Sequence, residues 1–218
     1  MIKDLNLLIN SRLINEASLK LPNIDFKISL NSPTGNFFYD PWELKPEFKN
    51  TVWEKILSVL PSDIGEARLI KLTKGSCYIA HADVDDRWHI NIISGKSYLV
   101  DLDSTKMYSL KPDRWYDMDA GVVHSAVNFG GEDRVQLVVR KLLTNATLKS
   151  PMTIEITSDT SDNSWRYLFD NTYSPILNRL NKEGKLADFK NLETSVTFRT
   201  EDTVSFPSHR CFEIKAWR

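Results

Sequence analysis

Between Ala67 and Leu142 the chain alternates short segments rich in apolar residues with clusters of turn residues. Within several segments every second residue is apolar, which is the period of a strand with one buried face. Gly, Asp, Asn and Ser separate the segments, and these residue types favour turns. We therefore predict strands over residues 67–73, 76–83, 87–93, 97–102, 106–110, 115–119, 122–128 and 133–142.

Short strands at this spacing are typical of a jelly roll, or double-stranded β-helix, in which the ends of strands distant in sequence meet at one mouth of a barrel. The expected fold is mainly β, with a cupin-like core, bracing N-terminal helices and a small α+β C-terminal appendage. The expected parts are an N-terminal bracing segment over 1–66, the double-stranded β-helix core over 67–148 and the appendage over 149–218.

The flanking segments show other patterns. Apolar positions predict a helix over 4–18 capped by Asp4, and a second helix that follows an Asn50 cap and ends at Pro61. Residues 22–30 alternate as a strand would, and the aromatic cluster after them, residues 37–42, is interpreted as the edge of a core. In the appendage we expect strands over 153–157, 194–199 and 211–217, and a helix over 164–182.

Composition narrows the function classes. The chain has 218 residues, 41% of them hydrophobic, and a formal net charge of −1, so it belongs with globular proteins. It contains no long run of like charges, and we therefore do not expect a nucleic-acid partner. No signal-peptide core or membrane-length apolar segment is found. Cys77 and Cys211 are interpreted as two lone, buried thiols, which suits a reducing, cytoplasmic protein.

Three of the four histidines lie between His81 and Arg134. Because side chains alternate along a strand, His81 and Asp83 are expected on the same side, where His124 could join them. Two histidines and one carboxylate with open positions opposite form the facial triad of non-haem Fe(II) oxygenases. The same ligands with a water molecule would also suit a zinc hydrolase, and zinc outranks ferrous iron in the usual affinity series.

Arg134 adds a second element to this cluster, ten residues after His124. An arginine binds a carboxylate through two parallel hydrogen bonds, and a buried arginine needs such an anion. The far carboxylate of 2-oxoglutarate would satisfy it, whereas a zinc hydrolase would not need it. Alternation places Arg134 on one face with Gln136, Val138 and Arg140, and it places Arg87, His89 and Asn91 opposite Trp88, Ile90 and Ile92.

The ordered set His-x-Asp, Arg-x-His, His-Ser-x-x-Asn and an Arg ten places after the last histidine resembles the Fe(II)/2-oxoglutarate oxygenases. It looks most like their aspartyl/asparaginyl β-hydroxylase and bacterial proline hydroxylase branch, over residues 69–143. The resemblance implies that the catalytic iron ligands are His81, Asp83 and His124. It implies that Arg134 holds the distal carboxylate of 2-oxoglutarate and that Arg87 and His89 assist cosubstrate binding. Some aspartyl hydroxylases lack the acidic ligand, so Asp83 moves this chain towards the proline hydroxylases.

The reaction implied by the resemblance is hydroxylation of an amino acid, free or within a peptide or protein, with Fe(II), 2-oxoglutarate and O2. Succinate and CO2 would be released, and ascorbate could serve as a reductant. Two alternatives stay open. One is a nucleic-acid demethylase of the same superfamily, prompted by Arg134 and Arg140 six residues apart. The other is a non-catalytic or zinc-binding cupin-like protein that binds a small acid.

Overall fold

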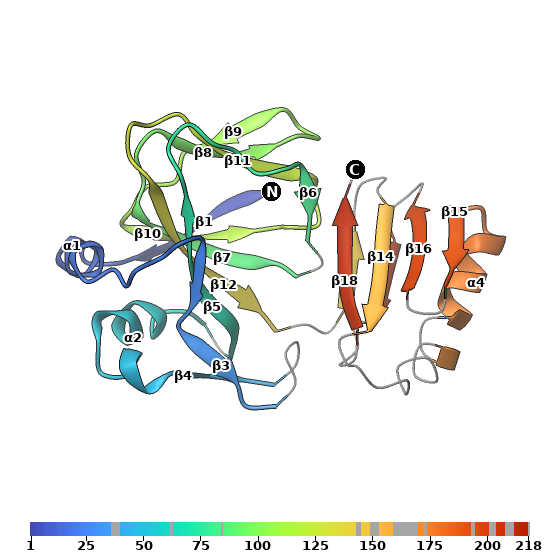
Figure 1. Ribbon diagram of the computed structural model, residues 1–218, viewed down its shortest axis with the longest axis horizontal. Coiled ribbons are helices and arrows are strands. Elements are labelled where there is room, and N and C mark those ends of the chain that lie inside the picture. The colour runs from blue at the N-terminus through green and yellow to red at the C-terminus, as the bar shows by residue number, and fades with distance from the viewer. Residues whose placement is uncertain are drawn as a thin grey trace.

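The computed structural model describes residues 1–35, 40–61, 63–83, 85–142, 145–148, 153–158, 170–171, 174–192, 195–200, 204–207 and 212–217. The described chain is mainly β (Figure 1). Its elements in order are β1 (Ile2–Leu8), α1 (Ser11–Leu19), β2 (Lys27–Ser29), β3 (Asn31–Pro33), β4 (Trp42–Leu44), the 3-10 turn η1 (Pro46–Phe48), α2 (Val52–Leu57), β5 (Ile64–Leu72), β6 (His81–Ala82), β7 (Arg87–Ile93), β8 (Ser97–Asp101), β9 (Lys106–Tyr108), β10 (Arg114–Met118), β11 (His124–Asn128), β12 (Arg134–Lys141), β13 (Asn145–Leu148), β14 (Thr153–Ser158), α4 (Ser174–Lys182), β15 (Leu186–Asn191), β16 (Ser195–Thr200), β17 (Val204–Pro207) and β18 (Phe212–Trp217).

Two large antiparallel sheets contain most of these strands. The first has the order β1-β10-β7-β12-β5-β2, and the second has the order β15-β16-β14-β18-β6-β11-β8-β9. The pairs β13-β17 and β3-β4 are separate. The sheets are open, so the single closed barrel expected from the sequence is not formed. Strand β1 pairs with the edge of β10, β2 pairs with the edge of β5, and β18 pairs with the edge of β6. These edges are therefore not available to join the two sheets into a barrel.

The central strands lie where alternation predicts them, within a few residues at each end. The exception is the expected strand 76–83, of which only His81 and Ala82 form β6. The residues before it run beside β11 without regular pairing. Cys77 makes an isolated bridge to Val127, and the amide of Tyr78 donates to the carbonyl of Ala126 at 2.9 Å. The Cys77 thiol is free but exposed, so its predicted burial is wrong.

The predicted helix over 4–18 is wrong in its first half. Residues 2–8 form β1, which pairs with β10, and the Asp4 carboxylate binds Arg114 at 2.9 Å instead of capping a helix. The helix begins at Ser11, where the Asn10 side chain accepts a hydrogen bond from the Arg12 amide. The second helix, α2, is likewise capped by Thr51 and not by Asn50. The leucine spacing fits either a helix or a strand, so pairing with β10 decides the outcome.

One face of the first sheet packs against α1 and α2 and forms the main apolar core (Figure 1). Trp88, Ile90 and Ile92 of β7 lie in this core, together with Val135, Leu137 and Val139 of β12. The predicted alternation of these two strands is confirmed. Because the apolar residues of β7 and β12 lie on the face of the sheet that packs against the helices, the polar residues between them lie on the opposite face, toward the second sheet. This division places polar side chains in the space between the sheets.

The second sheet continues into the C-terminal part of the chain. Strand β18 pairs with β6, with Ala216 opposite Ala82 and Trp217 opposite His81 (Figure 1). The strands predicted after residue 149 are found as β14, β16 and β18. Of the predicted helix 164–182, the structure describes α4 and residues 170–171. The aromatic residues 37–39, Cys211 and His209 lie outside the described residues.

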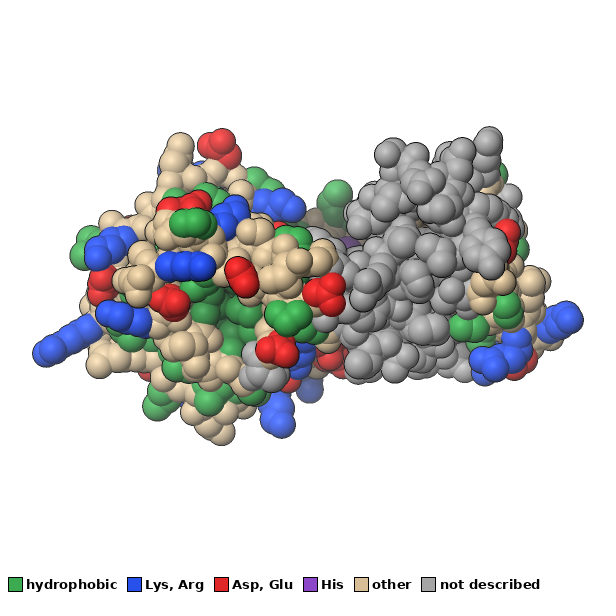
Figure 2. All heavy atoms as spheres, turned by 90° about the horizontal axis from the view of Figure 1, so that it is seen from below, with side chains coloured by type: hydrophobic (Ala, Val, Ile, Leu, Met, Phe, Trp, Pro, Cys, Tyr) green, Lys and Arg blue, Asp and Glu red, His purple; other side chains and the backbone are tan. Residues whose placement is uncertain are grey.

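Charges of both signs are interspersed on the described surface seen in Figure 2, without a block of Lys and Arg. None of the helices that the structure describes combines the length and the apolar composition that a membrane crossing would need.

Candidate metal centre and the inner pocket

The structure brings His81, Asp83 and His124 together, as their spacing predicts. His81 on β6 is paired directly with His124 on β11, and Asp83 follows β6 by one residue. One donor atom from each residue lies within 4.8 Å of the others. The Asp83 Oδ2 atom is 3.7 Å from His81 Nε2 and 3.5 Å from His124 Nε2. These three donor atoms can bind one metal ion on one side and leave its other side open.

Backbone carbonyls fix the proton position on both imidazole rings. His81 Nδ1 lies 2.7 Å from the Ile79 carbonyl oxygen, and His124 Nδ1 lies 2.8 Å from that of Val122. A carbonyl only accepts, so each Nδ1 carries the proton and each Nε2 presents a lone pair. Ligating histidines typically make this hydrogen bond through their other ring nitrogen. The buried Asp83 Oδ2 has no hydrogen-bond partner, so three lone-pair donors converge on a place that suits a cation.

Arg87 binds the other oxygen of Asp83. Its Nη2 atom is 2.7 Å from Asp83 Oδ1, and its Nε atom is 3.4 Å from Asp85 Oδ2. Burial alone would raise the pKa of Asp83, but the nearby Arg87 charge and the two imidazoles hold that pKa below its usual range. Asp85 is itself buried and lies 2.7 Å from Arg140. The metal-facing carboxylate is therefore oriented by a buried network of alternating charges.

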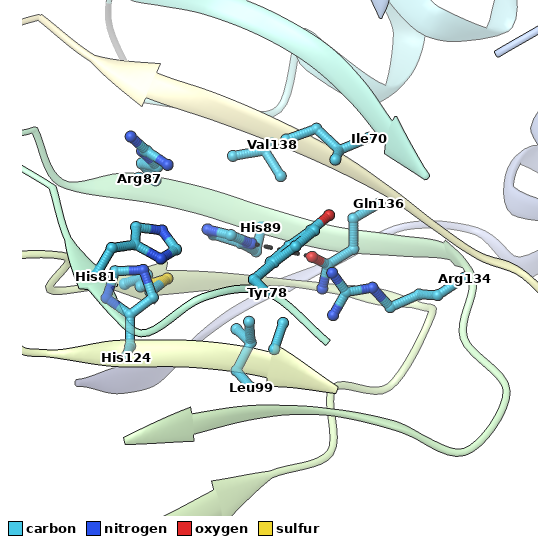
Figure 3. A pocket seen from close by; sticks show the side chains of 12 residues that line it. Ile70, Tyr78, His81, Arg87, His89, Leu99, His124, Arg134, Gln136 and Val138 are labelled. Carbon is cyan, nitrogen blue, oxygen red and sulfur yellow. Dashed lines mark hydrogen bonds between the residues drawn. The ribbon is translucent and has the colours of Figure 1, made fainter. Parts of the chain in front are cut away.

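A pocket lies between the sheets beside this cluster. Figure 3 shows His81 and His124 together at one end and Arg134 at the other, with Tyr78 and His89 between them. Its volume is about 50 Å³, which is several times the volume that one water molecule requires. We call it the inner pocket, defined by Tyr78, His81, His89, His124, Arg134 and Gln136.

Arg134 is a buried charge without a carboxylate partner among the described residues. Its side chain is 2% exposed, and its Nε atom has no hydrogen-bond partner. The Tyr78 ring is its aromatic neighbour, with the Arg134 Cζ atom 5.8 Å from the ring centroid. Burial lowers the pKa of Arg134. An unpaired buried charge is costly, and a bound anion would satisfy it.

His89 is the middle polar group of the pocket. Its Nδ1 atom lies 3.4 Å from Gln136 Oε1, and its Nε2 atom is buried without a partner. Burial, together with the charge of Arg87, lowers the pKa of His89 to about 3. The ring is therefore neutral near pH 7, and one nitrogen remains free to bind a ligand in the pocket.

Two further polar residues near the site have structural partners. Arg140 of β12 binds Asp85 through its Nη2 atom at 3.1 Å. Asn128 is fully buried and ties the turn after β11: its Nδ2 donates to the carbonyls of Leu72 and Glu132, at 3.1 and 2.8 Å, and its Oδ1 accepts from the Gly130 amide. We assign Asn128 to the fold and not to ligand binding.

Replacing Asn128 with alanine is therefore expected to lower the free energy of unfolding by about 1–3 kcal/mol, since buried backbone groups lose their partners. Urea unfolding of both proteins measures this loss. Binding of metal and of small acids to the folded variant should be unchanged. A variant as stable as the original chain, with weaker ligand binding, would contradict this assignment.

Sequence reasoning missed Tyr78 and Asp85, and it named Gln136 only as a neighbour of Arg134 on one strand face. Gln136 shares the face of Arg134, so alternation had already placed it beside the site. Tyr78 lies within the predicted strand 76–83, but only His81 and Ala82 of that segment form a strand, so strand alternation does not set its direction. Asp85 was interpreted as a turn residue together with Asp86, although it is 1% exposed and ion-paired.

No protein-family model matches the chain, and no curated protein matches it either. The assignment of a function therefore depends on the geometry of the site.

Proposed function

We propose that this protein is an Fe(II)- and 2-oxoglutarate-dependent dioxygenase that hydroxylates an amino acid, free or within a peptide or protein. The observation that carries the proposal is the inner pocket: His81 and His124 lie at one end, and Arg134, which has no described carboxylate partner, lies at the other. Asp83 lies beside the two histidines and completes the set of donors. A facial set of two imidazoles and a carboxylate suits ferrous iron. A buried guanidinium suits the far carboxylate of a dicarboxylic acid.

The residues present fit a metal ion. Asp83 Oδ2 is buried without a partner, and both Nε2 atoms face it with lone pairs. Bound Fe(II), with 2-oxoglutarate and O2, would supply the oxidising chemistry that no side chain can provide. A ferrous centre also favours the reducing, cytoplasmic setting expected from the sequence. Zinc fits the same ligands, but a zinc hydrolase leaves the buried Arg134 unexplained.

The protein side of this mechanism is positioning. The carbonyls of Ile79 and Val122 orient the two ligand rings, and Arg87 fixes the Asp83 carboxylate at 2.7 Å. Arg134 would hold the distal carboxylate of the cosubstrate. The apolar side chains of Leu99 and Val138 line the same pocket and would limit the water around a bound cosubstrate.

The strand order supports a double-stranded β-helix core. Strands β5, β12, β7 and β10 are neighbours in the first sheet, and β6, β11, β8 and β9 are neighbours in the second. Except at β8–β9, successive strands alternate between the sheets from β5 to β12, as in a jelly roll. This arrangement accounts for the meeting of His81 and His124.

The test is an assay of CO2 and succinate release from 2-oxoglutarate with added Fe(II), ascorbate and a panel of amino acids and short peptides. We expect iron-dependent turnover, stimulation by the true substrate, and a product heavier by one oxygen atom. Activity with zinc alone, or binding of the acid without succinate, would instead favour the zinc-binding or small-acid alternative.

A further inference from the structure

A second cavity adjoins the inner pocket at the candidate metal ligand His81. Its volume is about 510 Å³, and it shares Ile70, Tyr78, His81 and Arg87 with the inner pocket. Asp83 also lines it. The two spaces therefore meet at the metal ligands, and a molecule in this outer cavity would lie beside the metal. We use the name outer cavity for the space lined by Phe26, Lys27, Arg68, Tyr78, Ile79 and Asp83.

Positive charge dominates the wall of the outer cavity. Its charged lining residues among those described are Lys27, Arg68, Arg87 and Asp83. Asp83 is already engaged by Arg87, and a metal ion would add further positive charge. The remaining cations, Lys27 and Arg68, favour an anionic ligand in this space.

Arg68 is the better placed of the two to bind an anion. It lies on β5, its side chain is 12% exposed, and its Nη1 atom donates to Glu66 Oε2 at 2.7 Å. Its Nε atom is buried without a partner. Burial and the nearby charges of Arg87 and Arg140 lower the pKa of Arg68. An anion in the cavity would relieve this crowding of positive charge.

Arg87 cannot serve as this anchor while it holds the metal ligand. Its guanidinium binds both Asp83 and Asp85. Any ligand anion that took Arg87 would release the carboxylate that faces the metal. Arg68 can accept an anion without that loss, since its carboxylate partner, Glu66, lies outside the cavity lining and also binds the Ser29 hydroxyl.

The mouth of the outer cavity is apolar. Two large apolar side chains of its lining are exposed, Phe26 to 57% and Ile79 to 87%. The Phe26 ring meets the Tyr78 ring edge-on, with centroids 6.3 Å apart. A ligand with a hydrocarbon body would cover these side chains and remove their surface from water.

We propose that the outer cavity binds a small carboxylic acid, with Arg68 as the anchor of its carboxylate and Phe26 and Ile79 against its apolar body. The role of this acid as substrate rests on the proposed oxygenase function. The substrate of that reaction is then a molecule that carries a free carboxylate.

The test compares 4-methylvalerate with 4-methylvaleramide, which share one apolar body, by calorimetric titration of the full chain. We expect the acid to bind roughly 10- to 100-fold more tightly, as for a hydrogen-bonded charge. Arg68→Met should abolish this preference. Lys71→Met is the matched control, because it removes a positive charge from the other face of β5; it should keep the preference. Thermal unfolding checks each variant, and Arg68→Gln replaces Arg68→Met if the latter does not fold.

The variant Arg134→Met distinguishes binding in the outer cavity from binding in the inner pocket. The acid preference should survive it, because the anchor of the inner pocket is not the anchor proposed for the outer cavity. Equal affinity for acid and amide, no binding of either, or a preference lost only in Arg134→Met would overturn the proposal. The titration needs neither iron nor turnover. A missing succinate signal alone contradicts the oxygenase, and a missing acid preference alone contradicts the Arg68 anchor.

Discussion

Replacing His124 with alanine is expected to abolish iron-dependent turnover of 2-oxoglutarate. Its Nε2 atom is one of three lone-pair donors, 3.5 Å from Asp83 Oδ2. Loss of a group that only orients a ligand typically weakens metal binding about 10- to 100-fold, so loss of a ligand should exceed this. Metal content after dialysis and succinate release at saturating cosubstrate measure the two effects.

Val127→Ala is the matched control for this variant. Val127 lies on β11, as His124 does, but alternation turns it away from the inner pocket. The control should keep its metal and its turnover. Asp83→Asn tests the carboxylate without changing its shape and should also lose metal. Metal content equal to that of the original chain in both His124→Ala and Asp83→Asn would rule out the assigned ligands.

The sequence predicts the local parts of the site well. Alternation on β7 and β12 depends only on neighbouring residues, and burial of the apolar face against α1 and α2 enforces it. Hence the directions of Arg87, His89, Arg134 and Gln136 follow from the pattern. The pairing of His81 with His124 needed a further assumption, namely that β6 and β11 are neighbours.

What the sequence does not predict depends on contacts between distant segments. Residues 2–8 form a strand because β10 offers them an edge, and no local signal reveals that edge. The ion pair of Asp85 with Arg140 joins residues 55 positions apart, so the position of Asp85 in a predicted turn between two strands does not indicate this pairing. The pairing of β18 with β6 likewise joins segments that are far apart in the sequence, so local patterns do not predict it.

Replacing Arg134 with methionine is expected to weaken 2-oxoglutarate binding while making the ligand-free protein more stable. Loss of a buried charge pair costs about 2–4 kcal/mol of binding, which is roughly 30- to 1,000-fold in the dissociation constant. In the free protein the guanidinium is 2% exposed and has no described carboxylate partner. Replacing buried charges with a well-packed apolar side chain often stabilises a fold by about 1–4 kcal/mol.

These opposite signs distinguish a binding residue from a structural one. If Arg134 supported the fold, its removal would lower both the free energy of unfolding and the affinity for 2-oxoglutarate. If Arg134 serves to bind an anion, its removal lowers the affinity alone. Arg114→Met is the matched control, since Arg114 is also a strand arginine but pairs with Asp4 and lies outside the inner pocket. It should leave cosubstrate affinity unchanged. Urea unfolding and calorimetric titration with 2-oxoglutarate give the two readouts, and unchanged affinity in Arg134→Met would place the anion site elsewhere.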